Sequence, residues 1–335
     1  MDDTVRQVDR AALDRILTLE LARVTERAAV AASRLRGRGD EMAADQAAVD
    51  AMRKELNQLP IDGTVVIGEG ERDEAPMLYI GERVGTRNGP AVDIALDPLE
   101  GTTIAAKNLP NSIATIAIAN GGGLLAAPDV YMDKVAIGPG FAPGLVDLDM
   151  TPTERLQALA NAKGVKTSQL TACVLDRPRH AAMIEEIRAA GASIMLIGDG
   201  DVAAVIHVTS PAETGVDIYM GIGGAPEGVL AATALRCIGG QMQGRLVTHS
   251  AQQRERAAKM GVSDLSKKFS ERELASGDVL FAATGVTDGN LLSGVKFKPN
   301  AVTTHTVVMR SSSGTVRWIR AEHQDLQKFA DGLDP

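Results

Sequence analysis

The sequence predicts a layered α/β (α+β) protein in which two α/β sandwich domains pack against each other. The chain of 335 residues is longer than a single-core domain usually is, so its length fits two packed domains or one large layered unit. Two helical patterns precede a series of short β-branched runs, and later in the chain such runs alternate with helical patterns, as in βαβ units. We therefore expect an N-terminal domain over residues 1–160 and a C-terminal domain over residues 161–335.

The N-terminal part is expected to open with two helices. Apolar residues recur at helical spacing over residues 13–35, and Gly37 and Gly39 then end the pattern. A second helix is expected over residues 41–58, on an apolar stripe formed by Val49, Met52, Leu56 and Leu59. Asp45 lies one turn before this stripe, on the same face. A carboxylate on the inward face of a helix is costly to bury unless a cation meets it, so Asp45 is a candidate functional residue.

Strands are expected where short β-branched runs end in turn residues. The first such runs are residues 64–68, 91–97 and 112–119. A second series, at residues 170–175, 193–197 and 216–220, alternates with helices that should begin after Pro178, Asp201 and Pro226. The chain then returns to strand patterns at residues 279–284, 301–310 and 315–321.

The composition argues against two classes of partner. Aromatic residues make up only 3% of the chain and the formal net charge is -8, so neither a stacking platform nor a basic footprint for nucleic acid is available. No segment approaches a transmembrane length or resembles a signal peptide, and we expect no membrane partner. Cys173 and Cys237 stand in apolar surroundings without a CxxC pair, so we expect buried free thiols in a cytoplasmic protein.

Acidic residues stand where the expected strands and helices end. Asp97 and Glu100 follow the strand pattern directly, in a segment where Pro98 and Gly101 favour a turn, and both carboxylates can point to one centre. Glu69 is flanked by two glycines at the end of the preceding strand pattern.

Glu227 is the next acid of this kind. It follows a glycine-rich loop and Pro226 and should lie in the first turn of a helix. Together with Asp45 these carboxylates form an oxygen-only ligand set, because the five histidines are scattered and show no ligand spacing. Such a set selects hard cations such as Mg²⁺ or Mn²⁺.

The segment Asp97-Pro-Leu-Glu-Gly-Thr102 resembles the metal motif of the lithium-sensitive phosphatase superfamily, which includes inositol monophosphatases and fructose-1,6-bisphosphatases. A wider set of motifs resembles the class II fructose-1,6-bisphosphatases, in order from about residue 21 to residue 319. These motifs are Gly37-Arg-Gly-Asp40, Val66-Ile-Gly-Glu-Gly-Glu71, Asp73-Glu-Ala-Pro-Met-Leu78, Asp176-Arg-Pro-Arg-His180, Asp199-Gly-Asp201 and Gly221-Ile-Gly-Gly-Ala-Pro-Glu-Gly228. The resemblance implies the sugar-phosphatase fold, with a metal-binding N-terminal domain and a C-terminal domain that completes the substrate site.

The resemblance also implies the roles of individual residues. Two or more divalent ions, Mn²⁺ or Mg²⁺, would be held by Asp45 and Glu69 at one position and by Asp97, Glu100 and Glu227 at a second. Thr102 and Asp73 would be the catalytic residues, and Thr102 would orient or help to deprotonate the attacking water. Substrate contacts are implied for Glu100, Gly101, Thr102, Tyr131, Arg177, Pro178, Arg179, Asp199, Gly200, Asp201 and Gly224.

The implied reaction is hydrolysis of the 1-phosphate of fructose 1,6-bisphosphate to fructose 6-phosphate, in gluconeogenesis or the reductive pentose phosphate cycle. Sedoheptulose 1,7-bisphosphate shares the ketose 1-phosphate end and is a further candidate substrate. Two alternatives are an inositol or nucleotide monophosphate phosphatase of the same superfamily and a non-catalytic sugar-phosphate-binding protein. Arg177 and Arg179, which suit a second phosphate, favour a bisphosphatase. A homo-oligomer, dimer or tetramer, is expected.

Several of these residues also have simpler structural interpretations. Asp45 could be a partly exposed helix acid, Arg177 and Arg179 could form surface ion pairs, and Tyr131 could be a core residue. Glu41 is a departure from the family pattern, which usually has Lys directly after Gly-Arg-Gly-Asp. Glu41 would either weaken a contact to phosphate or metal-bound water, or be a solvated acid in the first turn of a helix.

Overall fold

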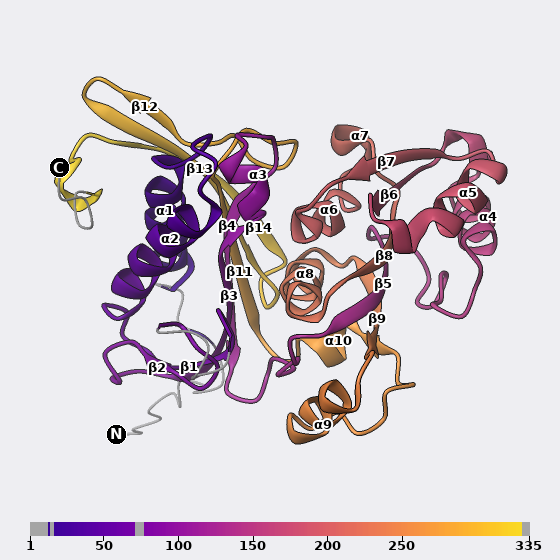
Figure 1. Ribbon diagram of the computed structural model, residues 1–335, viewed down its shortest axis with the longest axis horizontal. Coiled ribbons are helices and arrows are strands. Elements are labelled where there is room, and N and C mark those ends of the chain that lie inside the picture. Colours follow the sequence, from indigo (N-terminus) through magenta and orange to yellow (C-terminus); the bar gives the residue numbers. More distant parts are fainter. Residues whose placement is uncertain (1–12, 14–16, 71–76, 330–335) are drawn as a thin grey trace, which may run out of the picture.

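The computed structural model of the protein describes residue 13, residues 17–70 and residues 77–329. Figure 1 shows five layers, which are helices α1 and α2, a first sheet, a central helical layer with α8, a second sheet, and helices α4 and α5. The three hydrophobic clusters fill the spaces between these layers. The predicted α/β sandwich arrangement is therefore confirmed.

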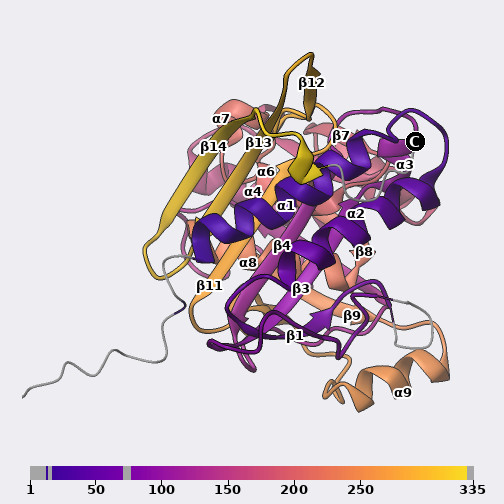
Figure 2. The ribbon, with the colours of Figure 1, turned by 90° about the vertical axis from the view of Figure 1, so that its left-hand side faces the viewer.

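The outer helices α1 (Leu17–Ser33) and α2 (Glu41–Leu56) cover one face of the first sheet. Figure 2 shows α1 and α2 side by side in front of its strands. Each buries an apolar stripe, and the stripe predicted for α2 is buried as expected at Val49, Met52 and Leu56. Asp40 caps α2 by accepting a hydrogen bond from Ala43 N at 2.9 Å.

The first sheet has the strand order β12-β13-β11-β4-β3-β1-β2, and β14 lies beyond β13. Its strands are β1 (Asp62–Ile67), β2 (Arg83–Val84), β3 (Ala91–Glu100), β4 (Ile113–Asn120), β11 (Val279–Gly285), β12 (Lys296–Lys298), β13 (Ala301–Arg310) and β14 (Thr315–His323). β1 is parallel to β3, and the other neighbouring pairs are antiparallel.

The second sheet has the order β10-β9-β5-β8-β6-β7. Its strands are β5 (Tyr131–Ile137), β6 (Thr171–Leu175), β7 (Ser193–Ile197), β8 (Ile218–Gly224), β9 (Gln241–Val247) and β10 (Phe269–Ser270). β6 is parallel to both β7 and β8, as the alternation of strands and helices predicted.

Helices cover both faces of the second sheet. On its outer side lie α4 (Pro152–Lys163) and α5 (Ala181–Ala189). Between the two sheets lie α6 (Asp201–His207), α8 (Ala225–Ile238) and α10 (Glu271–Leu274). Further short elements are α3 (Thr102–Ala106), α7 (Pro211–Thr214), α9 (Ala251–Lys259) and the 3₁₀ turns Thr167–Gln169, Pro178–His180 and Gln327–Phe329. α8 contacts strands of both sheets, and this position explains why its sequence is apolar on nearly all sides.

The distribution of the chain between the sheets differs from the expected boundary at residue 160. β5 lies before that boundary but belongs to the second sheet, whereas β11, β13 and β14 lie after it and belong to the first. The physical reason is that β11 pairs with β4 over residues 279–285. This pairing joins the late strands β11, β13 and β14 to the strands of the N-terminal part. Sequence patterns also missed β5 and β9, which are antiparallel neighbours in the second sheet. No helix in the described part of the chain is long and apolar enough to cross a membrane.

Candidate active site

The predicted acidic residues meet where β1 and β3 of the first sheet end beside the start of α8. Two adjoining hollows with different linings lie there. The first has a volume of about 360 Å³ and is lined among others by Asp45, Glu69, Asp97, Thr102 and Glu227.

The second hollow has a volume of about 430 Å³ and shares Asp97, Gly101, Asp129, Asp199 and Glu227 with the first. Its other lining residues include the predicted substrate residues Glu100, Tyr131, Arg177, Arg179, Asp201 and Gly224. The predicted metal ligands and most predicted substrate residues therefore border one continuous region.

Not every predicted residue lies there. Pro178 and Gly200 are not among the described lining residues of either hollow. Gly200 instead has a backbone φ of +82° and lies against Glu100, whose Oε2 is 3.4 Å from the position that a Cβ would take. Asp73 belongs to residues 71–76, which lie outside the described part of the chain.

A bulge in β3 places Asp97 and Glu100 on the same face of the sheet. Asp97 pairs with Thr115 of β4 and Glu100 pairs with Ile113, so three steps along β3 match two steps along β4. Side chains alternate between faces along a regular strand, and one extra residue restores the same side for both acids. The strand thus continues to Glu100, beyond the end at residue 97 that the sequence predicted.

Glu100 is held by the second sheet's helical layer. Its Oε1 accepts a hydrogen bond from Val202 N, in the first turn of α6, at 3.0 Å. Its Oε2 is buried and has no hydrogen-bond partner among the described residues. A buried carboxylate oxygen without a donor is costly unless a ligand supplies the missing interaction.

Glu227 enters the site from the N-terminus of α8. Gly224 precedes this helix, and a Cβ at Gly224 would overlap the Glu227 carboxylate. Glu227 Oε2 is also buried without a hydrogen-bond partner among the described residues. The absence of a side chain at Gly224 therefore leaves the space that the Glu227 carboxylate occupies.

Asp45 and Glu69 approach from the other side. Asp45 lies on α2, one turn before the buried stripe, and is half-buried as its position on that face predicted. Glu69 follows β1, and its backbone N–H donates to Leu78 O at 3.1 Å. Gly68 packs so closely on the carbonyl of Leu78 that no Cβ fits there. Close packing of the turn thus fixes where Glu69 leaves the sheet.

The carboxylates lie close enough to raise one another's pKa. Burial and the charge of Asp45 raise the pKa of Glu69 to about 8. Burial raises the pKa of Asp97 well above its usual value, and the charges of Glu100 and Glu69 raise it further. Burial alone raises the pKa of Asp45.

The two acids next to α6 and α8, Glu100 and Glu227, also have raised pKa values. Burial and the charge of Asp201 raise the pKa of Glu100 well above its usual value. Burial and Asp201 also raise the pKa of Glu227 to about 6, and the positive charge of Lys134 opposes this rise. A group of buried acids that repel one another favours the binding of a cation between them.

The donor set fits hard divalent cations. All of these side chains offer carboxylate oxygens, and two of the oxygens are buried without a partner among the described residues. The described His, Cys, Asp and Glu side chains do not, however, include three or more already gathered in ligating positions around one point.

Arg179 and Tyr131 form one wall of the second hollow. The Arg179 guanidinium carbon lies 4.7 Å from the centroid of the Tyr131 ring. Its Nε and Nη2 both donate to Ile222 O, at 3.0 and 2.6 Å, so this edge of the guanidinium is already used. Tyr131 is 41% exposed, which excludes the alternative of a core residue. Arg177 lines the same hollow, and its Nη1 donates a hydrogen bond to Asp176 O at 3.3 Å.

His180 holds this wall in place. Its Nε2 accepts a hydrogen bond from Ile222 N at 2.8 Å, which leaves Nδ1 to donate to Leu175 O at 2.7 Å. The ring therefore ties the end of β6 to β8 as a neutral imidazole. Burial lowers the pKa of His180, in agreement with this arrangement. No spacing of histidines in the sequence had indicated a role for His180 at the site.

Asp199 and Asp201 differ in their surroundings. Asp199 is half-buried and borders both hollows, and burial raises its pKa, with smaller contributions from Asp201 and Glu41. Asp201 is only 5% exposed, and its Oδ2 accepts hydrogen bonds from Lys134 and, at 3.1 Å, from Tyr219. Glu41 itself is the exposed first residue of α2, so both interpretations of this position have support.

Three further polar residues of this region were not predicted from the sequence. Asp129 borders both hollows, Gln253 of α9 borders the second, and Lys134 lies behind them in β5. Tyr131 and Lys134 belong to β5, a strand that the sequence pattern did not reveal, and Asp129 stands two residues before its start. Over residues 131–137 the charged residues Asp133 and Lys134 stand next to each other and interrupt the apolar pattern, so neither alternation nor a continuous apolar run marked this strand.

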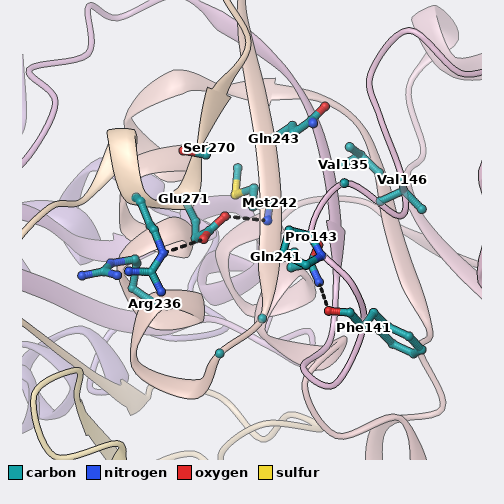
Figure 3. A pocket seen from close by; sticks show the side chains of 14 residues that line it. Val135, Phe141, Pro143, Val146, Arg236, Gln241, Met242, Gln243, Ser270 and Glu271 are labelled. Atoms are coloured by element: carbon teal, nitrogen blue, oxygen red, sulfur yellow. Dashed lines mark hydrogen bonds and ion pairs between the residues drawn. The ribbon is translucent and has the colours of Figure 1, made fainter.

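A separate cavity, of about 390 Å³, lies at the opposite end of β5 and β9 (Figure 3). Gln241 bridges to Phe141 O at 2.8 Å there, and Glu271 lies 3.7 Å from Arg272. Its lining contains none of the residues that border the two acidic hollows. The cavity is therefore distinct from the candidate active site.

Comparison with known proteins identifies the family. A family described as bacterial fructose-1,6-bisphosphatase, glpX-encoded, matches residues 15–323. The chain belongs to this family. A protein of Synechococcus sp. (strain JA-3-3Ab), named D-fructose 1,6-bisphosphatase class 2/sedoheptulose 1,7-bisphosphatase, is 46% identical over 348 residues, which cover 96% of this chain and 98% of that protein. The family resemblance inferred from the sequence motifs is confirmed.

A Prochlorococcus marinus (strain MIT 9313) protein of the same name is also 46% identical, over 93% of this chain and 97% of its own length. Among solved structures, an inositol monophosphatase from Anabaena (Nostoc) sp. PCC 7120 matches 58% of this chain and 70% of its own chain at 13% identity. Its TM-score of 0.30 is too low to bear on the assignment. The sequence matches alone carry the family membership of this fructose-1,6-bisphosphatase homologue.

Proposed function

We propose that the protein hydrolyses the 1-phosphate of fructose 1,6-bisphosphate to give fructose 6-phosphate and inorganic phosphate. Sedoheptulose 1,7-bisphosphate, which has the same ketose 1-phosphate end, is proposed as a second substrate. The observation that carries this proposal is the meeting of five buried or half-buried carboxylates with Arg177 in two adjoining hollows of a chain from this family. The reaction would serve gluconeogenesis or the reductive pentose phosphate cycle.

Divalent ions, Mn²⁺ or Mg²⁺, are the proposed cofactors. Asp45 and Glu69 would hold one ion, and Asp97, Glu100 and Glu227 would hold a second. When bound, such ions supply Lewis-acid chemistry, which neutralises charge on the phosphoryl group and lowers the pKa of the attacking water. The unpartnered Oε2 atoms of Glu100 and Glu227, identified among the described residues, support these ligand roles.

Thr102 is the proposed catalytic hydroxyl. It is the first residue of α3, directly after Gly101 in a left-handed conformation, and it borders the first hollow. From there its hydroxyl would hold the attacking water in line with the scissile bond and accept a hydrogen bond from it. Asp73 is a second proposed catalytic residue on the basis of its motif.

Substrate binding is proposed for the wall of the second hollow. Arg177, which lines this hollow, would bind the phosphate that is not hydrolysed. Arg179 would stack with Tyr131 and orient it, because two of its nitrogens already bind Ile222 O. Asp199 and Asp201 would accept hydrogen bonds from sugar hydroxyls.

The second candidate function is a monophosphatase of the same superfamily. The position of Arg177 and Arg179 on one wall of the second hollow favours a bisphosphate over a monophosphate. We also propose that the protein is a cytoplasmic homo-oligomer, a dimer or tetramer. Phe297 of β12 and Trp318 of β14 are exposed on two strands that both pair with β13, and they support self-association at this end of the first sheet.

The test is phosphate release from both bisphosphates and from inositol 1-phosphate, with Mg²⁺, Mn²⁺ or chelator, beside Asp97→Ala. Metal-dependent release from fructose 1,6-bisphosphate that is lost in Asp97→Ala is the expected result. Faster release from inositol 1-phosphate would favour the monophosphatase, and the absence of release from any substrate by a folded, metal-binding protein would contradict both.

A further inference from the structure

Lys134 is a fully buried lysine, with 0% exposure, in the middle of β5. Its Nζ forms an ion pair with Asp201 Oδ2 and donates a hydrogen bond to Gly224 O at 3.0 Å. Asp201 begins α6 and Gly224 ends β8, so one ammonium group joins three separate elements (Figure 1). Both of its partners belong to the substrate side of the proposed site.

The surroundings leave little freedom for this arrangement. A Cβ at Gly223 would overlap Asp201 Oδ2 and lie 3.0 Å from Lys134 Nζ, so β8 packs its bare backbone directly onto the pair. The Tyr219 hydroxyl is the second donor to the same Oδ2, at 3.1 Å. Burial raises the pKa of Tyr219 well above its usual value, so the phenol remains a donor.

We propose that Lys134 and Tyr219 are positioning residues of the substrate site, and that they orient the Asp201 carboxylate for a sugar hydroxyl. Both donors bind Oδ2, which leaves Oδ1 as the oxygen that a hydroxyl group can reach from the second hollow. The contact from Lys134 to Gly224 O fixes the neighbouring backbone in the same arrangement. This inference rests on the proposed function of the site.

A buried ion pair by itself is weak support for a role in binding, because such pairs also occur for structural reasons. The chain offers a matched control in Lys163, which pairs with Asp217 at the opposite end of β6 and β8. Asp217 accepts from Thr171 N at 2.8 Å, and neither Lys163 nor Asp217 is among the described residues that border the two hollows. Loss of either lysine leaves a buried carboxylate without its cation and lowers the Tm.

The experiment compares Lys134→Met, Tyr219→Phe and Lys163→Met with the wild type. The readouts are KM and kcat for fructose 1,6-bisphosphate, the Tm, and the Kd of fructose 6-phosphate measured by calorimetry in chelator. We expect Lys134→Met to raise KM and Kd by about ten-fold and to change kcat by less than about three-fold, because an interaction that is lost equally from ground and transition states affects binding. Tyr219→Phe should raise both by roughly three-fold, as the loss of one neutral donor does.

Lys163→Met should lower the Tm and leave KM and Kd at the wild-type values. The proposal is overturned if Lys134→Met and Tyr219→Phe lower the Tm but keep KM and Kd within about two-fold of the wild type. If Lys134→Met does not fold, Tyr219→Phe alone decides, and an unchanged KM overturns the proposal. Failure of the proposed function is distinguishable, because the wild type itself would then release no phosphate.

Discussion

Asp97 and Glu100 lie on one face of the first sheet although three positions separate them along β3. The pairing of Asp97 with Thr115 and of Glu100 with Ile113 requires one extra residue in β3, and Pro98 and Leu99 supply it. In a strand without this bulge, one of the two carboxylates would face the helices on the outer side of the sheet. The bulge therefore decides that both acids reach the same site.

Neutralising one of these acids should stabilise the metal-free protein while it removes activity. In chelator, Asp97→Asn should raise the Tm by about 2 °C or more, because it relieves a buried carboxylate of repulsion from Glu100 and Glu69. With metal present, kcat/KM should fall on the order of 1,000-fold. Mn²⁺ should raise the Tm of the wild type more than that of the variant. A lower Tm of the variant in chelator would contradict this account of the site.

Gly224→Ala should inactivate the protein without unfolding it. The new Cβ would overlap the Glu227 carboxylate, a flexible end that can move aside, so Glu227 should leave its position at little cost in stability. We expect kcat/KM to fall roughly 100-fold, since a displacement near 1 Å has effects of this size. Gly198→Ala is the matched control, because a Cβ there meets no heavy atom of the described residues within 4 Å. Equal activity of the two variants would show that Glu227 does not depend on this space.

Glu41→Lys should strengthen substrate binding. The negative charge of Glu41 contributes to the raised pKa of Asp199, which borders both hollows, so its reversal makes the site less repulsive to phosphate. KM should fall by about three-fold at low salt and by less at high salt, because exposed charges are screened. The substitution places a cation in the first turn of α2, which costs about 0.3 to 1 kcal/mol of stability.

Glu41→Gln is the control for this comparison and should show an intermediate KM. If KM is unchanged in both variants at low salt, Glu41 has no effect on substrate binding and is only an acid in the first turn of α2.

His207 should make the protein less stable in mild acid. This residue is 2% exposed, neither ring nitrogen has a hydrogen-bond partner among the described residues, and burial lowers its pKa from 6.5 to about 4. Its folded-state pKa lies below the unfolded value, so the unfolded state binds a proton first as the pH falls. Its contribution is complete above pH ~6.5 and is lost progressively as the pH falls from there to about 4.

Urea unfolding at pH 7.5 and pH 5 tests this prediction in the wild type and in His207→Met. The wild type should lose about 2 kcal/mol more than the variant between the two pH values. At pH 7.5 the variant should be at least as stable as the wild type, because it removes two unpartnered polar atoms. Equal losses in the two proteins would contradict the assignment.

Much of the fold could be predicted because its signals are local. The stripe that contains Val49 and Met52 predicted α2, and β7 and β13 were predicted with the bounds that the structure has. β5 and β9 were missed because their half-buried positions interrupt the apolar pattern over residues 131–137 and 241–247. Their stability comes from pairing with each other and with β8 rather than from their own composition.

The candidate site was predictable to the extent that its residues stand in short motifs. Asp97, Glu100 and Glu227 were singled out by turns, proline and glycine, and the structure brings them to adjoining hollows. Lys134 carried no such signal, since a lysine in a strand pattern usually marks the solvent-exposed face. Only the burial of that lysine between α6 and β8 shows that it belongs to the site.

The sequence by itself determined the family and predicted many of the helices and strands, because these depend on neighbouring residues and on motif order. Tertiary structure decided which distant segments meet. β11 pairs with β4 although more than 150 residues separate them in the sequence. Asp201 binds Lys134 across a sequence separation of 67 residues. Such contacts depend on which surfaces can be buried together and on the entropy of closing long loops. Neither can be predicted from a short stretch of sequence.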